Sequence, residues 1–488
     1  VSKIVKKYHG SLSGEHGDGR IRAPFLKEQF GKVVYQYFVD LKHTFDPKNL
    51  FNPGVILSDT SILENLRPVI SQQELTTAFD WRDDLSFYYA VEKCNGAGVC
   101  RKSIGGIMCP SYKATRGEEF STRGRANLLR KALSSEDPTK SLKNSELKEA
   151  LDLCLACKAC KSECPANVDM AKLKSEYLFQ IRNAGSYVKS WHIKNLGYIL
   201  KIGSKAPDTF NFLQSSFLGR KLIGFERQPP LLQKKSLSDW WSACKTNNED
   251  CSTTVWVIVD IFTQYYDVSI GQDVLNLLKK CKVNIKVVFP KNSIVAMVSY
   301  GLLNEAKNEL KILHSQLNDA AKNDLIVGIE PSEVLVWRDE AKSLLNGRLP
   351  NVLLFEELLL ELDQLKVLPK FHALNTKVWV YEHCHQKSLA ETENTIKLLE
   401  LIPELQIEIV NGGCCGMAGE FGYKFPEISD TIAHQSLDNY MSRVGKNDVL
   451  VVTGTSCRKQ ILDIFSIRSI HWPQLFNNTI KMKVNIEE

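Results

Sequence analysis

Four cysteines in one short run constrain this 488-residue chain more than any other feature. They follow the spacing Cys154-x2-Cys157-x2-Cys160-x3-Cys164, with Pro165 directly after the last. This spacing is typical of thiolates that hold the corners of a cubane iron–sulfur cluster. A structural zinc site also takes four thiolates, but it requires no third cysteine at this distance. The run therefore predicts iron–sulfur ligation, with structural zinc as the alternative.

A second cysteine group precedes the run, with the spacing Cys94-x5-Cys100-x8-Cys109. In two-cluster ferredoxins the cysteine before proline ligates the neighbouring cluster. This crossover predicts one complete 4Fe-4S site, whose ligands are Cys109, Cys154, Cys157 and Cys160. The second site then has only Cys94, Cys100 and Cys164, and it holds a three-iron cluster, a four-iron cluster with a non-cysteine ligand, or nothing. We therefore expect one or two clusters.

Four arginines follow the second group, and they allow two interpretations. They form a solvated helical face, or they compensate the negative charge of a cluster. They are Arg116, Arg123, Arg125 and Arg130.

Composition limits the classes of partner and compartment. The chain has 62 basic and 56 acidic residues, a net charge of +6, and no long basic stripe, so nucleic acid is a poor candidate partner. It has no apolar run long enough to span a membrane and no secretory leader. Fourteen cysteines in such a chain indicate metal or redox chemistry in a reducing compartment, which predicts a cytoplasmic protein. Cys244, Cys251 and Cys281 are interpreted as ordinary buried or loop thiols.

The pattern of apolar and turn residues predicts a multidomain chain of the α+β and α/β classes. Because it starts at Val1 inside a dense motif, we expect it to be part of a longer polypeptide. The predicted segments are the end of a domain at 1–57, a linker at 58–90, a helical cysteine-bearing domain at 91–205, a second linker at 206–253, and two α/β repeats at 254–370 and 371–488.

The two α/β repeats show internal duplication. The tripeptide Val-Trp-Val occurs at 255–257 and again at 378–380, and Asn323-Asp324 matches Asn447-Asp448. The second repeat has four cysteines after its predicted strands, where parallel sheets bind ligands. These are Cys384, Cys414, Cys415 and Cys457, opposite which the first repeat has Ile261, Asn292, Ser293 and Glu333. We predict that an iron–sulfur centre, a zinc or a redox disulfide occupies the second repeat, and that the first repeat is a scaffold.

The N-terminal residues carry a further motif. Residues 10–20 read GSLSGEHGDGR, and Asp46-Pro47 and Asn52-Pro53-Gly54 follow. This region resembles the C-terminal end of the FAD-linked oxidase domain of D-lactate, glycolate and D-2-hydroxyglutarate dehydrogenases. The remainder is similar to the ferredoxin-like iron–sulfur and cysteine-rich (CCG) domains of glycolate oxidase and heterodisulfide reductase subunits. Together the parts resemble the fused bacterial D-2-hydroxyacid dehydrogenases.

The resemblance implies roles for particular residues. His16 matches the family's catalytic base, and Glu15 matches a ligand of a divalent metal such as zinc or manganese. Asn52 lies near the flavin, and Arg20 or Arg22 grips a substrate carboxylate or forms an exposed ion pair. FAD is held mostly by an upstream part of the family's domain. Val55 stands where the family usually has Lys.

The implied activity is oxidation of a D-2-hydroxy acid, D-2-hydroxyglutarate or D-lactate, to the 2-oxo acid. Electrons then pass through the clusters to a quinone or a carrier protein. The stretch Phe217–Lys235 is basic and apolar, and it is either a peripheral contact at the inner face of the membrane or a packed linker. Two alternatives are an electron-transfer module without a substrate site and a thiol redox protein like heterodisulfide reductase.

Overall fold

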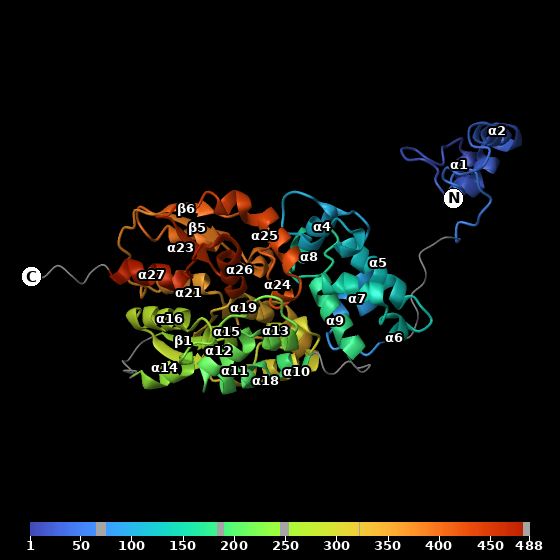
Figure 1. Cartoon of the computed structure of the whole chain (residues 1–488). Coiled ribbons are helices and arrows are strands. Elements are labelled where there is room, and N and C mark those ends of the chain that lie inside the picture. The colour runs from blue at the N-terminus through green and yellow to red at the C-terminus, as the bar shows by residue number, and fades with distance from the viewer. Residues whose placement is uncertain (65–74, 183–189, 245–252, 322, 482–488) are drawn as a thin grey trace, which may run out of the picture. The chain divides into compact units, whose positions relative to one another are not determined.

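The computed structural model describes residues 1–64, 75–182, 190–244, 253–321 and 323–481 (Figure 1). The chain divides into two compact units, residues 1–69 and 70–488. Among the described residues, no helix combines the length and the apolar character that crossing a bilayer requires.

The N-terminal unit is helical, with α1 (Ser2–Lys7) and α2 (Ala23–Phe45). Gly31 has φ 82° and interrupts the regular helix within α2. Asp46 follows α2 and accepts hydrogen bonds from two backbone N–H groups four and five residues further on, at 2.8 and 2.9 Å. The Asp-Pro turn is therefore closed by local contacts.

The second unit begins with a helical domain that carries the first seven cysteines. Phe79 and Trp81 are buried in its core, and the carboxylate of Glu176 accepts the Phe79 N–H and the Trp81 indole N–H. The end of the predicted linker at 58–90 thus belongs to this core, because its aromatic side chains are buried there. The elements are η1 (Arg82–Asp84), α3 (Phe87–Glu92), η2 (Val99–Arg101), α4 (Pro110–Thr115), η3 (Glu118–Phe120), α5 (Thr122–Leu133), α6 (Pro138–Ser141), α7 (Ser145–Asp152), α8 (Ala159–Glu163) and α9 (Met170–Arg182).

Short helices connect this domain to the first sheet, and three of them lie in the predicted linker at 206–253. Asn211 stabilises this segment, because its side chain donates to the carbonyl oxygen of Leu232 and accepts from the backbone N–H of Leu232. Cys244 is half-buried, whereas Cys251 lies outside the described residues. The connecting helices are α10 (Trp191–Lys194), α11 (Leu196–Gly203), α12 (Pro207–Ser215), α13 (Phe217–Ile223) and α14 (Leu237–Ala243).

The first α/β unit is a parallel sheet in the order β2-β1-β3-β4. The central strand is a continuous apolar run that is buried on both faces, as expected when helices cover a parallel sheet. Cys281, at the end of α16, is buried. The elements are β1 (Thr254–Ile258), α15 (Ile261–Tyr265), α16 (Val268–Lys280), β2 (Asn284–Val288), α17 (Ile294–Ser299), α18 (Leu303–Leu317), β3 (Leu325–Gly328), α19 (Pro331–Arg338), α20 (Glu340–Leu345), β4 (Val352–Leu353) and α21 (Phe355–Gln364).

The second α/β unit is a parallel sheet in the order β6-β5-β7. Its elements are β5 (Lys377–Tyr381), α22 (Cys384–Leu389), α23 (Glu393–Leu399), β6 (Gln406–Ile409), α24 (Phe421–Lys424), α25 (Pro426–Met441), β7 (Val449–Val452), α26 (Thr455–Phe465) and α27 (Trp472–Lys481).

The two sheets contain the same tryptophan–aspartate hydrogen bond and pack around a common hydrophobic core. In each, a tryptophan of the central strand donates its indole N–H at 2.8 Å to an aspartate before a neighbouring strand: Trp256 to Asp324, and Trp379 to Asp448. Valines from both central strands pack in the same buried cluster, which also contains Trp472. The two α/β units therefore stabilise each other through a common hydrophobic core.

Candidate functional site

Four cysteines from two separate segments line one pocket of the helical domain. Apolar side chains such as those of Leu155 and Met170 complete the wall of this pocket. The structure thus brings together the four residues predicted to form the complete cluster site, three from the contiguous run and one from the earlier group. They are Cys109, Cys154, Cys157 and Cys160.

Hydrogen-bond donors point at the sulfur atoms around this pocket. The N–H of Met170 donates to Cys160 Sγ at 3.3 Å, and the hydroxyl of Thr122 lies 3.4 Å from Cys109 Sγ. Burial raises the pKa of the Cys160 thiol well above its usual value, so the free thiol is neutral at pH 7. Iron would take it as a thiolate, and the surrounding donors would then stabilise the sulfur charge.

The backbone of the cysteine run is wound tightly around the pocket. Ala156 and Lys158 have φ of 50° and 61°, in the left-handed region. Each of these two residues lies between consecutive cysteines of the run, so the chain turns there. Such backbone costs energy for a residue with a side chain, and it persists where surrounding contacts hold it.

Arg125 corrects the solvated-face interpretation of the arginines. It is 1% exposed, and its guanidinium donates to Cys109 Sγ at 3.5 Å, to Ser111 Oγ at 2.8 Å and to the Ala150 carbonyl at 2.6 Å. A buried cation beside this sulfur would offset the negative charge of a cluster held there, which is the alternative interpretation. Sequence spacing alone could not separate Arg125 from the more exposed Arg130.

The second predicted cysteine set is less complete. Cys94 and Cys100 are both buried, and the N–H of Arg123 donates to Cys100 Sγ at 3.4 Å. Ala97 stands where the x2 spacing of a ferredoxin run would place a cysteine between them. Cys164 is only half-buried, so its grouping with Cys94 and Cys100 stays a prediction.

The spacing of the thiols bears on the zinc alternative. Across the described ranges, no group of three or more His, Cys, Asp or Glu side chains is arranged to hold a metal ion. A cubane instead places its ligands at separate corners. Structural zinc therefore stays the alternative to a cluster at these four thiols.

The four cysteines of the second α/β unit also come together. Their thiols contact one another in series, from Cys384 to Cys414, then to Cys415, then to Cys457. The contact with Cys414, together with burial, raises the pKa of Cys384 well above its usual value. This places all four predicted residues in one thiol site at the carboxyl edge of the sheet.

Histidine and lysine side chains surround the C-terminal thiol site. His383 Nε2 lies 4.0 Å from Cys384 Sγ, and a side chain on Gly454 would meet the His383 ring at 2.6 Å. Lys387 donates from Nζ to the carbonyl oxygens of Val410 and Gly412, at 3.2 and 3.0 Å. Lys387 was not singled out from the sequence, although it lies three residues after Cys384 in the same helix.

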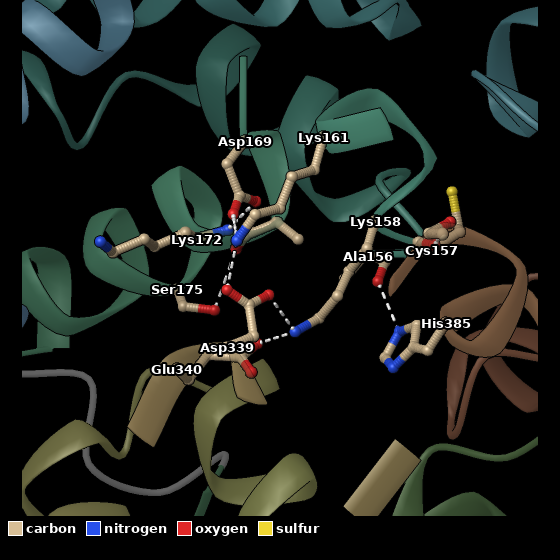
Figure 2. A network of polar contacts seen from close by, with 12 residues as sticks. Ala156, Cys157, Lys158, Lys161, Asp169, Lys172, Ser175, Asp339, Glu340 and His385 are labelled. Atoms are coloured by element: carbon tan, nitrogen blue, oxygen red, sulfur yellow. Dashed lines mark hydrogen bonds and ion pairs between the residues drawn. The ribbon is translucent and has the colours of Figure 1, made fainter. Parts of the chain in front are cut away.

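The two thiol sites meet at the cysteine run. The hydroxyl of Ser388, in the same helix as Cys384, donates to the carbonyl of Cys157 at 3.4 Å. His385 Nε2 donates to the carbonyl of Ala156 at 2.9 Å, as Figure 2 shows. The loop that wraps the first pocket is thus in direct contact with helix α22, which carries the second site.

A buried ion network attaches the other side of the same loop to the first α/β unit (Figure 2). Lys158 is 3% exposed and pairs with Asp339 at 2.8 Å and with Glu340. Lys161 pairs with Asp339 and, at 3.4 Å, with Asp169. Burial alone would raise the pKa of Asp339, but the charges of the two lysines hold it below its usual range. Both lysines lie inside the cysteine run, so this network positions the loop.

We expect Asp339→Asn to lower the free energy of unfolding by about 2 kcal/mol, because Lys158 stays buried with only one of its two anionic partners. Less iron should be retained, since the loop loses an anchor. Denaturant unfolding followed by circular dichroism, with iron analysis, measures both effects.

Asp463→Asn is the matched control, since it removes a more exposed pair with Lys459 and should cost less than about 1 kcal/mol. Equal stability and iron content in Asp339→Asn and the native protein would show that the network does not hold the loop.

In the first α/β unit, the positions opposite the four cysteines are used for packing and hydrogen bonding. Ile261 is buried with Leu200 in a small core cluster, and Asn292 Nδ2 donates to the carbonyl of Lys194 at 2.6 Å. Ser293 donates its hydroxyl to the carboxylate of Glu333. Burial raises the pKa of Glu333 to about 8, so its carboxyl is mostly protonated at neutral pH. These contacts match the role of a scaffold.

Glu15 and His16 lie in an exposed loop of the N-terminal unit. Their side chains are 89% and 88% exposed, and Glu15 Oε2 lies 4.0 Å from His16 Nε2. Arg22 holds the loop, because its guanidinium donates to Ser13 Oγ at 3.2 Å and to the Gly17 carbonyl at 3.1 Å. Of the two candidate arginines, Arg22 thus already has a structural partner.

The Asn-Pro-Gly turn is joined to the same loop. Asn52 has φ 46°, and the N–H of Ile56 donates to the carbonyl of Gly19 at 3.0 Å. This bond brings the turn beside Arg20, which is exposed. The four N-terminal candidates Glu15, His16, Arg20 and Asn52 therefore belong to two connected loops.

Comparison with known proteins agrees with both parts of this description. Residues 1–56 match the family of FAD linked oxidases, C-terminal domain, and residues 90–168 match the 4Fe-4S dicluster domain. D-2-hydroxyglutarate dehydrogenase of Escherichia coli (strain K12) is 30% identical over 524 residues, covering 94% of this chain and 50% of that protein. The enzyme of the same name from Pantoea ananatis (strain AJ13355) is 28% identical, with the same two shares.

A more distant relative covers less of the chain. One subunit of the anaerobic glycerol-3-phosphate dehydrogenase of Escherichia coli (strain K12) is 22% identical over 258 residues, covering 51% of this chain and 65% of that protein. No solved structure matches the chain significantly. The chain spans about half the length of the D-2-hydroxyglutarate dehydrogenases it matches. Its N-terminal residues are therefore similar to the C-terminal domain of FAD linked oxidases, its cysteine-bearing domain is similar to the 4Fe-4S dicluster domain, and 94% of the chain aligns with a D-2-hydroxyglutarate dehydrogenase.

Proposed function

We propose that this chain is the cluster-bearing part of an FAD- and iron–sulfur-dependent dehydrogenase that oxidises a D-2-hydroxy acid to the 2-oxo acid. The observation that carries the proposal is the combination, in one chain, of an FAD-linked oxidase segment and four thiols around one pocket. D-2-hydroxyglutarate is the first substrate to test, because relatives of that name match 94% of the chain. D-lactate is the second.

In this proposal the N-terminal loops act on the substrate. His16 takes the proton of the substrate hydroxyl, and Glu15 holds a divalent metal that orients the hydroxyl and carboxylate. The flavin, when bound, supplies the hydride acceptor. Both side chains are exposed in the N-terminal unit, so neither is committed to a packing role. Arg20 is the candidate for the substrate carboxylate, and Asn52 is the candidate flavin contact.

The cysteine sites carry the electrons onward. We propose that Cys109, Cys154, Cys157 and Cys160 hold a 4Fe-4S cluster, which accepts and releases single electrons. The two α/β units are interpreted as a duplicated pair of CCG domains, in which only the second holds a soft centre. The contact between the cysteine run and α22 supports transfer from the first site to the second.

The final acceptor is a quinone or a carrier protein. We propose that the protein works in the cytoplasm, with a peripheral contact at the inner face of the membrane.

The test is anaerobic rapid mixing of the chain, together with its flavin-binding part and FAD, with D-2-hydroxyglutarate or D-lactate. Flavin absorbance should bleach first and cluster absorbance second. A protein whose clusters are reduced by dithionite while neither acid bleaches the flavin would instead be an electron-transfer module. Oxidation of the thiol sites by a disulfide substrate, without flavin reduction, would favour a thiol redox protein.

A further inference from the structure

Helices α11, α12 and α13 expose many large apolar side chains. Neither α12 nor α13 has a buried residue, although both contain Phe and Leu. Helix α12 packs against both α11 and α13, so the three form one surface (Figure 1). The most exposed apolar side chains of these three helices are those of Tyr198 at 66%, Phe212 at 74%, Phe217 at 71%, Leu218 at 72% and Leu222 at 89%.

Helical spacing places lysines among these apolar side chains. In α13, Phe217, Leu218, Lys221 and Leu222 are one and four residues apart and share a face. In α11, Tyr198 and Lys201 share a face in the same way.

The exposed face of α12 has the same spacing. Asp208, Phe212 and Leu213 share this face, and Asp208 is the acidic residue of the three helices. Each helix therefore exposes a face that carries both apolar and charged side chains.

The segment is also strongly basic. Residues 191–235 contain eight Lys and Arg and two acidic residues, a net charge of 8 − 2 = +6 that equals the net charge of the whole chain. Lys194 pairs with Glu305, and Arg227 pairs with Asp430. Within the described structure, no ion pair involves the side chains of Lys201, Lys205, Lys221, Lys234 or Lys235.

The residues that flank these helices are packed against the α/β units. The ring of Phe225, just after α13, stacks on Tyr423 with centroids 4.9 Å apart, and Glu226 N–H donates to the Tyr423 carbonyl at 2.8 Å. Leu232 is buried with Leu200 beside the first α/β unit. The side chains of α12 and α13 thus stay exposed on helices whose ends are fixed.

We propose that the surface of α11–α13 binds the face of an anionic lipid bilayer. Short helices with exposed Phe and Leu between lysines combine burial in the acyl boundary with attraction to anionic headgroups. A second copy of the chain is a poorer occupant, because pairing this surface with itself would bring two segments of charge +6 together.

Flotation of the full chain with phospholipid vesicles tests the proposal. The protein should float with phosphatidylcholine vesicles that contain about one third phosphatidylglycerol, and binding should fall at about 0.5 M NaCl. Leu222→Glu alone should lower the bound fraction, and Phe217→Glu together with Leu222→Glu should reduce it at least tenfold. Replacing Lys201, Lys205 and Lys221 by Gln should weaken binding by about fivefold per lysine, on anionic vesicles only.

Ile104→Glu is the matched control for Leu222→Glu, because Ile104 is 87% exposed and lies outside this surface. It should float like the native protein, and circular dichroism should show that all variants are folded. Absence of flotation would overturn the proposal, and so would equal flotation of Leu222→Glu and Ile104→Glu. A dimer that dissociates on Phe217→Glu, without vesicle binding, would assign the surface to a second copy. The measurement involves no turnover, so its failure leaves the proposed oxidation standing.

Discussion

His16→Ala is expected to slow flavin reduction by D-2-hydroxyglutarate by about 10²- to 10⁴-fold, the usual cost of losing a general base. The hydroxyl proton of the substrate would have no acceptor when hydride leaves the neighbouring carbon. FAD content should stay unchanged, because the His16 side chain is 88% exposed and supports no packing in its unit. Anaerobic stopped-flow bleaching of the flavin, in protein that includes the flavin-binding part, measures the rate.

His43→Ala is the matched control, since His43 is also an exposed histidine of the N-terminal unit. Its flavin should be reduced at the native rate. If His16→Ala and His43→Ala bleach equally fast, another residue acts as the base. If His16→Ala loses its FAD, the residue has a binding role instead.

Cys157→Ser is expected to remove most of the iron, sulfide and brown colour from anaerobically purified protein. Serine oxygen is a hard donor and a poor replacement for a thiolate on iron. Cys157 also lies where the cysteine run touches α22, since its carbonyl accepts a hydrogen bond from the Ser388 hydroxyl at 3.4 Å. Iron and sulfide analysis measures the loss, together with the electron paramagnetic resonance signal after dithionite reduction.

Cys244→Ser is the control, because this half-buried thiol lies outside both thiol sites. It should keep the full cluster content. Zinc in place of iron in the native protein would favour the structural zinc alternative. A Cys157→Ser variant with native iron content would exclude Cys157 as a ligand.

Local spacing explains what could be predicted from the chain alone. The spacing of the run from Cys154 to Cys164 is a local pattern, so the cysteines of the predicted cluster can be identified without knowledge of the fold. The strands β1 and β5 are apolar after their first residue, and the Val-Trp-Val tripeptide occurs in the central strand of each sheet. Such signals survive because they depend on neighbouring residues only.

Long-range contacts explain the rest. The burial of Arg125 against Cys109, the pairing of Lys158 with Asp339, and the contact of Cys157 with α22 each join residues that are distant in sequence. The helices α12 and α13 formed where turn residues and charge suggested a linker, because side chains such as that of Asn211 are satisfied by residues some twenty positions away. No local pattern specifies such partners. Burial and charge compensation depend on which elements pack together, so they arise only when the whole chain has folded.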